Sequence, residues 1–187
     1  MRIPLSPFSI RFTEFTFLFI VLPLCLWQTR AYFAQYLLVV LSMLGVSCAL
    51  FLYREGKLKK QWKKAKATSW LEIKPVLLTF FVCASGLAVY ACFFSEKLVL
   101  NTTLLISSSW LLTLIFYPLF SVIPQELIFR TFLFHRYKLL FPNKKTRMLV
   151  SSLCFGFGHV IYGSVMVVVL SIIAGLLFSY RYFLSGN

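Results

Sequence analysis

The chain has 187 residues, of which 60% are hydrophobic and 13% are charged. Soluble globular domains carry about 25% charged residues, so this composition excludes an ordinary soluble domain and is typical of a membrane protein. The formal net charge is +14, but the basic residues lie between apolar runs, as they do in the cytoplasmic loops of membrane proteins. We therefore expect no nucleic-acid partner. The apolar runs are continuous rather than alternating, which argues against a transmembrane β-barrel.

Several apolar runs predict transmembrane helices, because about 20 apolar residues are needed to cross the hydrocarbon core. The first run follows basic residues, as a signal peptide would, but no small-x-small cleavage site follows it, so we expect it to remain as a span. The sequence therefore predicts an all-α fold, a polytopic transmembrane bundle of about six spans, with residues 1–187 in one membrane domain. In chain order the runs are Phe15–Trp27, Ala31–Tyr53, Pro75–Phe94, Leu104–Ile123, Met148–Tyr162 and Ser164–Leu184.

Two basic loops predict how the bundle is oriented. Residues 54–74 and 124–147 hold most of the lysines and arginines, and such residues concentrate in cytoplasmic loops. Both loops fall on the same side when the six spans are counted, which places both termini in the cytoplasm. We also expect membrane lipids as partners, because the loop at residues 54–74 can lie on anionic headgroups.

The small residues inside the apolar runs predict packing rather than chemistry. Ser171, Gly175 and Ser179 recur every four residues on the last run, and such a stripe lets another helix approach closely. The cysteines form no C-x-x-C pair, so we expect buried small hydrophobic side chains and neither a disulfide framework nor a metal site. They are Cys25, Cys48, Cys83, Cys92 and Cys154.

Glu126 is the acidic residue that most needs a partner. It lies at the end of the fourth apolar run, in a chain whose only acidic residues are five glutamates. A carboxylate at the bilayer centre costs ~2.5–3.5 kcal/mol on translocon scales. Arg130 follows one helical turn later on the same face and can pair with it. An ionisable pair within the membrane is a functional-site hypothesis by default.

His159 is the second candidate, one turn after Phe155 on the fifth run. A glutamate and a histidine in a water-accessible cavity suit hydrolysis, because the carboxylate can take a proton from water while the imidazole orients it or protonates the leaving group. Zinc is not favoured, because one Glu and one His fall short of the usual three protein ligands. The residues alone leave open a structural Glu126–Arg130 pair and a transporter that relays protons.

Two motifs carry a resemblance to a known family. Residues Gln125–Arg130 (QELIFR) resemble the E-E-x-x-x-R signature of the CAAX-protease and bacteriocin-processing (CPBP, or Abi) family, and Phe155–His159 matches its F-x-x-x-H signature. Residues Ala174–Arg181 look like the glycine-containing helix that follows, so the similarity covers about residues 110–185. The family comprises intramembrane glutamic-type endopeptidases, among them prenyl-protein CAAX proteases, bacteriocin maturation and immunity proteins, and enzymes that trim C-terminal sorting tails.

The resemblance implies a role for each residue of the two motifs. A glutamate and His159 would activate water without a metal cofactor, Arg130 would orient the site, and Phe155 would pack beside the substrate cavity. The substrate would be a peptide or protein at the membrane, and the protein would be a multi-pass protein of the bacterial inner membrane. We therefore expect an intramembrane endopeptidase.

The sequence departs from the family pattern at two places. Gln125 stands where the family usually has its catalytic Glu, and a carboxamide has no basic carboxylate oxygen. Either Glu126 serves as the base or its support while Gln125 donates to the substrate carbonyl, or the protein binds peptides without cleaving them, as an immunity protein would. The third family motif, H-x-x-x-N, is not matched before Asn187, so we expect a shortened or truncated member.

Overall fold

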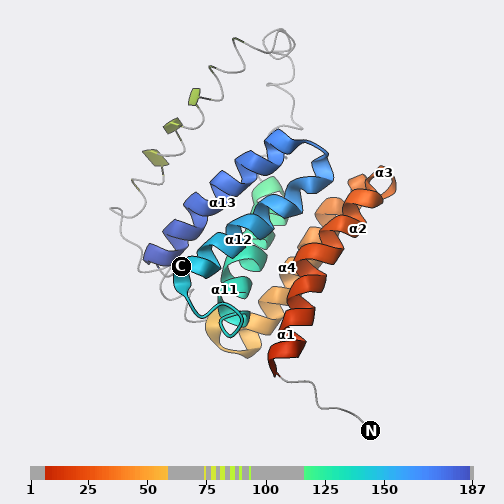
Figure 1. Cartoon of the computed structure of the whole chain (residues 1–187). Coiled ribbons are helices and arrows are strands. Elements are labelled where there is room, and N and C mark those ends of the chain that lie inside the picture. Colours follow the sequence, from red (N-terminus) through yellow and green to blue (C-terminus); the bar gives the residue numbers. More distant parts are fainter. Residues whose placement is uncertain are drawn as a thin grey trace.

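The computed structural model describes residues 7–58 and 116–185, together with scattered positions between residues 74 and 93 (Figure 1). All regular elements in these ranges are helices, and the described residues contain no strand. This confirms the all-α prediction. The third predicted span and the first part of the fourth lie mainly outside the described residues.

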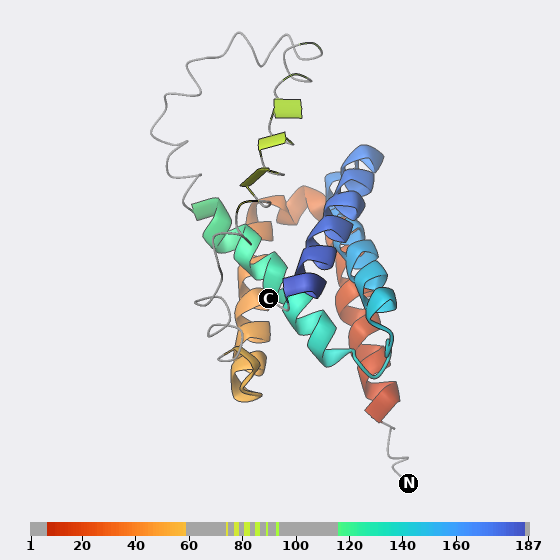
Figure 2. The same cartoon turned by 90° about the vertical axis from the view of Figure 1, so that its left-hand side faces the viewer.

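The N-terminal part is a helical hairpin. The helical segments α1 (Pro7–Thr16), η1 (Phe17–Val21) and α2 (Leu22–Gln28) follow one another without a break. The wide turns of η1 end next to Pro23, which cannot donate a helical backbone hydrogen bond. The short elements α3 (Arg30–Phe33) and η2 (Ala34–Tyr36) reverse the chain, and α4 (Leu37–Arg54) runs back in the opposite direction. Figure 2 shows the two arms of this hairpin spread apart.

A single helix, residues 116–136, runs through the middle of the bundle, and we call it the central helix. Figure 2 shows it crossing between α4 on one side and the C-terminal helices on the other. Its turns alternate between wide and regular α-helical geometry. They are η3 (Pro118–Val122), α10 (Ile123–Glu126), η4 (Leu127–Phe132) and α11 (Leu133–Arg136).

The C-terminal part is a second helical hairpin. Helix α12 (Lys144–Gly158) begins at Asn143, whose side chain accepts a hydrogen bond from the backbone N–H of Lys145, and it tightens into η5 (His159–Tyr162). Gly163 ends this segment with a φ of 66°, a left-handed conformation that favours glycine. Helix α13 (Val165–Ser185) then packs back along α12.

Three helices among the described residues are long and apolar enough to cross a membrane: Pro7–Gln28, Leu37–Arg54 and Val165–Leu184. They correspond to the first, second and sixth predicted spans. The chain is therefore a polytopic helical membrane protein. Helix α12 carries Lys144, Lys145 and Arg147 in its first turn, so its apolar part starts only after these residues.

The central helix packs against α4 through a proline and a glycine. Pro124 has no N–H, so the carbonyl of Phe120, one turn earlier, loses its helical partner. Ser42 of α4 replaces that partner by donating its hydroxyl to the Phe120 carbonyl oxygen at 2.9 Å. Gly45 makes the approach possible, because a Cβ there would lie 2.6 Å from the Cβ of Pro124.

The small-residue stripe of α13 packs against α12, as the sequence predicts. A Cβ on Gly175 would lie 3.0 Å from the Cα of Ser152, and the hydroxyls of Ser151 and Ser179 are 3.1 Å apart. Gly156 of α12 adds a second close approach, since a Cβ there would overlap the side chain of Ile172. Close helix packing through small side chains replaces the hydrophobic driving force that a bilayer does not supply.

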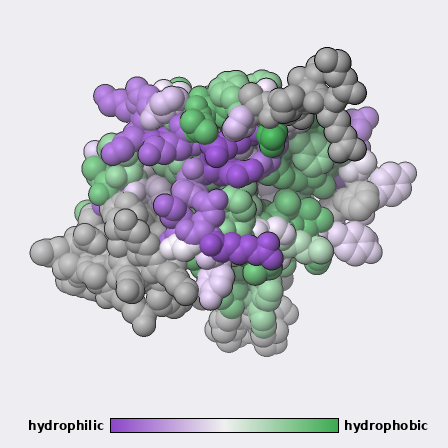
Figure 3. All heavy atoms as spheres, turned by 90° about the horizontal axis from the view of Figure 1, so that it is seen from below, coloured by the Kyte–Doolittle hydropathy of each residue, from purple (hydrophilic) through white to green (hydrophobic). Residues whose placement is uncertain are grey.

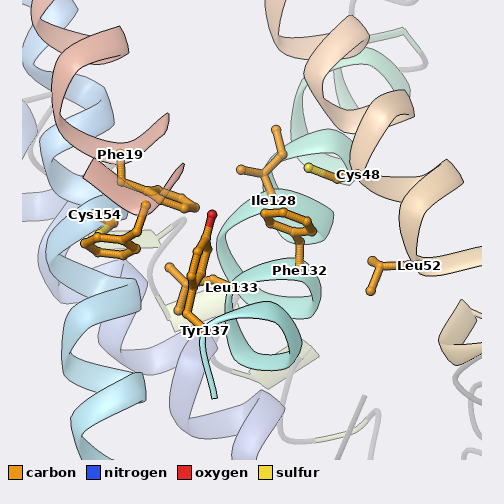
Figure 4. Close-up of a cluster of buried hydrophobic side chains, with 9 residues drawn as sticks. Phe19, Cys48, Leu52, Ile128, Phe132, Leu133, Tyr137 and Cys154 are labelled. Carbon is orange, nitrogen blue, oxygen red and sulfur yellow. The ribbon is translucent and has the colours of Figure 1, made fainter. Parts of the chain in front are cut away.

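The buried core lies between the first helix, α4, the central helix and α12. Figure 4 shows the side chains of Ile128, Phe132 and Leu133 of the central helix, and that of Tyr137 from the turn directly after it, in this core. Aromatic rings meet edge to face here, and Phe19 and Tyr137, for example, have centroids 5.8 Å apart. The central helix is therefore the element on which the others pack.

The cysteine prediction holds for two of the five residues. Cys48 and Cys154 are buried thiols of the core, whereas Cys25 is exposed on α2. The expectation of burial is wrong for Cys25, because an apolar helix that borders lipid can turn small apolar side chains outward. Cys83 and Cys92 lie outside the described residues.

One end of the bundle is polar. Figure 3 shows hydrophilic side chains gathered on the face that holds the start of α1, the end of α4 and α11. Two ion pairs tie helices together there: Glu14 with Arg136 at 2.7 Å, and Glu55 with His135 at 2.5 Å. The end of α4 with Arg54 and the turn after α11 with Lys138 lie at this end. The prediction that residues 124–147 form a loop is wrong for residues 124–136, which belong to the central helix.

The Gly45–Pro124 approach generates a test of the fold. We expect Gly45→Ala to destabilise the protein by about 1–3 kcal/mol, the usual cost of overpacking, because the added methyl must push α4 away from the central helix. Thermal unfolding in detergent measures this change. Gly86→Ala is the matched control, since a Cβ at Gly86 meets no described residue within 4 Å; equal melting temperatures for the two variants would contradict the proposed contact.

Candidate functional site

A cavity of about 320 Å³ lies between the N-terminal hairpin, the central helix and η5. Most of its wall is apolar, contributed by leucines and Phe19 of the first helix and by leucines of α4. The polar side chains that line it come from the central helix and from the end of the α12–η5 segment. They are Tyr117, Ser121, Gln125, His159 and Tyr162.

The turn at the end of α12 positions His159 in this wall. Its Nδ1 lies 2.7 Å from the carbonyl oxygen of Phe155, one turn earlier. A carbonyl oxygen only accepts, so Nδ1 must carry the proton, and in the neutral imidazole Nε2 then keeps its lone pair. The geometry therefore provides a nitrogen base in a largely apolar cavity.

Gln125 lines the same cavity from the central helix. Its side-chain Nε2 donates to the hydroxyl of Ser121, one turn earlier, at 3.0 Å. This bond fixes the carboxamide and leaves its carbonyl oxygen as an acceptor. Ser121, Gln125 and Phe129 follow one another at helical spacing, so a single face of the central helix presents the polar groups and an aromatic ring to the cavity.

Glu126 and Arg130 form the predicted ion pair, on another face of the central helix. Arg130 Nη1 lies 2.5 Å from Glu126 Oε1, and neither residue is among those that line the cavity. Consecutive helical residues are about 100° apart around the axis, so the face that carries Gln125 cannot also carry Glu126. The Glu126 side chain is 44% exposed, whereas that of Arg130 is 1% exposed.

The Arg130 guanidinium lies between two aromatic rings. Its Cζ is 4.9 Å from the ring centroid of Phe155 and 4.9 Å from that of Phe178, a cation–π geometry on both sides. Its Nε and Nη2 are buried and have no hydrogen-bond partner among the described residues. Arg130 therefore joins the central helix to both α12 and α13.

Phe155 connects the ion pair to the cavity. Its ring packs against the Arg130 guanidinium and also against the His159 ring, and the centroids of the Phe155 and His159 rings are 4.7 Å apart. Phe155 does not itself line the cavity; it lies behind His159 and is 7% exposed. The predicted site residues thus fall into a cavity pair, Gln125 with His159, and an ion pair, Glu126 with Arg130, with Phe155 between them.

Three cavity residues were not predicted from the sequence: Tyr117, Ser121 and Tyr162. Ser121 precedes Gln125 by one helical turn, so the i, i+4 spacing of polar groups on an apolar helix was the available signal. Tyr162 follows His159, and their ring centroids are 5.8 Å apart. The tyrosines carried no such signal, because aromatic residues are common throughout this chain.

The described residues contain no cluster of three or more His, Cys, Asp or Glu side chains that could hold a metal ion. Among the described residues that line the cavity, the strong metal donor is the His159 imidazole, since Gln125 offers a neutral carbonyl oxygen. This donor set falls short of the three protein ligands that a catalytic zinc ion usually requires.

Comparison with known proteins adds one finding. Residues 107–187 match the model of a protein family described as type II CAAX prenyl endopeptidase Rce1-like. The matched range contains both sequence motifs and the whole C-terminal hairpin, which confirms the family resemblance. No curated protein and no solved structure matches the chain.

The stacked guanidinium generates a test of what Arg130 contributes. We expect Arg130→Ala to destabilise the protein by about 3–5 kcal/mol, as loss of a large buried side chain does. Arg130→Met should cost less, because a thioether also packs favourably on aromatic rings. Thermal unfolding of both variants and of Glu126→Ala measures the difference; equal losses in all three would show that the ion pair, and not the stacking, holds the helices together.

Proposed function

Since residues 107–187 belong to the Rce1-like family of type II CAAX prenyl endopeptidases, we propose that this membrane protein is an intramembrane endopeptidase. Its substrate would be a membrane-associated peptide or protein with a CAAX-like end or a C-terminal sorting tail. The observation that carries the proposal is the cavity that His159 and Gln125 share between the helices.

The cavity residues support a hydrolytic mechanism. His159 Nε2 would accept a proton from water, whose oxygen would attack the peptide carbonyl carbon, and the resulting imidazolium would then protonate the leaving amine. A positioned base of this kind contributes about 10²–10⁴ in rate. Gln125, held by Ser121, would orient the attacking water through its carbonyl oxygen or donate to the substrate carbonyl.

The ion pair has a supporting role in this proposal. Glu126 is bonded to Arg130 and does not line the cavity, so it would act by holding the central helix in the rotation that presents Gln125. Phe155 would transmit that arrangement to the His159 ring, which it contacts. We assign Glu126 and Arg130 as positioning residues.

The polar end of the bundle supports a location for the site. We infer that this end faces the cytoplasm of a bacterial inner membrane, because basic loops are retained on that side, and that both termini lie there. The cavity is built from the start of α4 and from η5, at the opposite end. Cleavage would then occur in the outer half of the membrane.

Peptide binding without turnover is the second candidate, and Gln125 favours it. The residue of the first motif that lines the cavity together with His159 is a carboxamide, which cannot take a proton from water. A protein of this kind would still hold a peptide segment in the apolar cavity, as an immunity protein would, and would release it unchanged.

Replacement of the cavity residues separates the two candidates. A single-span reporter with a C-terminal sorting tail is co-expressed with the wild type, His159→Ala and Gln125→Glu, and its cleavage is followed by gel mobility. We expect His159→Ala to reduce cleavage at least about 10²-fold, as loss of a general base does. His135→Ala is the matched control, since His135 lies on the polar face, and it should cleave at the wild-type rate.

The same experiment identifies a binding protein. If the wild type leaves the reporter intact but co-purifies with it, and Gln125→Glu cleaves it, the protein binds peptides and lacks only the carboxylate. If neither the wild type nor Gln125→Glu cleaves or retains the reporter, both candidate functions are wrong for this substrate class.

Chelation tests the metal-free mechanism. We expect o-phenanthroline and EDTA to leave reporter cleavage by purified protein unchanged, because the cavity offers one strong metal donor. A loss of cleavage that added Zn²⁺ restores would contradict the mechanism.

A further inference from the structure

A second cavity lies at the polar end of the bundle, remote from His159. Its volume is about 360 Å³, and it is bounded by α11, the first turn of α12 and the last turn of α13. We call it the basic pocket. Its lining residues are Phe134, His135, Lys138, Lys144, Arg147, Tyr182 and Phe183.

The basic pocket holds cationic side chains without matching acidic ones. Its described lining residues include two lysines and an arginine but no aspartate or glutamate. None of these three cations takes part in an ion pair with another described residue. Glu55 contacts one pocket residue, His135, at 2.5 Å, and this bond holds the pKa of the Glu55 carboxyl below its usual range.

Arg147 is the most informative residue of the pocket. It is 7% exposed, and its guanidinium donates from Nη1 to the Phe134 carbonyl oxygen at 2.8 Å and from Nη2 to that of Pro142 at 3.5 Å. Its buried Nε has no hydrogen-bond partner among the described residues. Two neutral carbonyl groups thus hold the guanidinium in place, but no described carboxylate forms an ion pair with it. A buried charge without a counterion is costly.

The position of the basic pocket indicates which anion would compensate that charge. Helix α13 is apolar enough to cross the membrane and ends at the pocket. Phe183 lines the pocket while 41% of it is exposed on the lipid-facing helix, and Lys144 Nζ lies 5.5 Å from its ring. Positive charge therefore meets an apolar surface at the depth of lipid headgroups.

We propose that the basic pocket binds the phosphate group of an anionic phospholipid such as phosphatidylglycerol. The phosphate oxygens accept hydrogen bonds from three cationic side chains, those of Arg147, Lys138 and Lys144, which neutralise the phosphate charge. The first acyl carbons lie against Phe183. Basic pockets between membrane helices on the cytoplasmic side are suited to such headgroups. The lipid would fix α11 and both helices of the C-terminal hairpin to one another.

Native mass spectrometry of the full-length protein in detergent tests this proposal. The wild type is titrated with phosphatidylglycerol, phosphatidylcholine or inorganic phosphate, and the bound molecules are counted. We expect one phosphatidylglycerol to bind at least about tenfold more tightly than phosphatidylcholine, because each nearby cation adds to the attraction of an anionic lipid. Inorganic phosphate alone should not remain bound, since it lacks the acyl chains.

Paired substitutions with equal charge loss make the test specific to the basic pocket. Lys138→Gln/Lys144→Gln should weaken phosphatidylglycerol binding about tenfold or more. Lys57→Gln/Lys145→Gln removes the same charge from exposed positions outside the pocket and should change it less than twofold. Circular dichroism checks that both variants keep their helices.

Three results would overturn the proposal. Equal weakening by both double variants would mean that the lipid is attracted by net charge alone. Equal binding of both lipids by the wild type would mean that the phosphate charge is not recognised. Retention of inorganic phosphate as tightly as phosphatidylglycerol would mean that the ligand is a free phosphate compound.

Discussion

The burial of the Arg130 guanidinium is the constraint on which the rest of the bundle depends. It is almost fully buried, bonded to Glu126 and enclosed by Phe155 and Phe178. A charged group in that position must be compensated by its surroundings, so the rotation of the central helix and the positions of α12 and α13 are coupled. The site follows from that coupling, because Phe155 also supports His159.

The central helix satisfies this constraint because its neighbours supply hydrogen bonds that its own backbone lacks. Within a bilayer every backbone polar group must find a partner inside the protein. Ser42, Ser151 and Arg147 donate to the carbonyls of residues 120, 129 and 134, respectively. Each donor comes from a flanking helix, so the wide turns and the prolines of the central helix are tolerated and its register against α4 and α12 is specific.

The rotation of the central helix places two consecutive residues, Gln125 and Glu126, in different environments. Gln125 faces an apolar cavity together with His159, whereas Glu126 faces Arg130. A carboxylate at residue 125 would lie in the cavity without a bonded cation, and the carboxamide avoids that cost. The chain therefore carries its acid where it pairs with a buried cation and an amide in the cavity, where His159 is the one histidine among the described lining residues.

The sequence by itself determined the class of the protein, its helices within the described residues, the Glu126–Arg130 pair and the family resemblance, because apolar run length, i, i+4 spacing and short motifs are local properties. Only the tertiary structure decided which of these residues meet. His159 lines the cavity with Gln125 and without Glu126, and Phe155 lies behind the cavity wall. The Cys25 side chain is exposed. The physical reason is that the rotation of a helix depends on contacts distant in sequence, here Gly45 with Pro124 and Arg130 with Phe178.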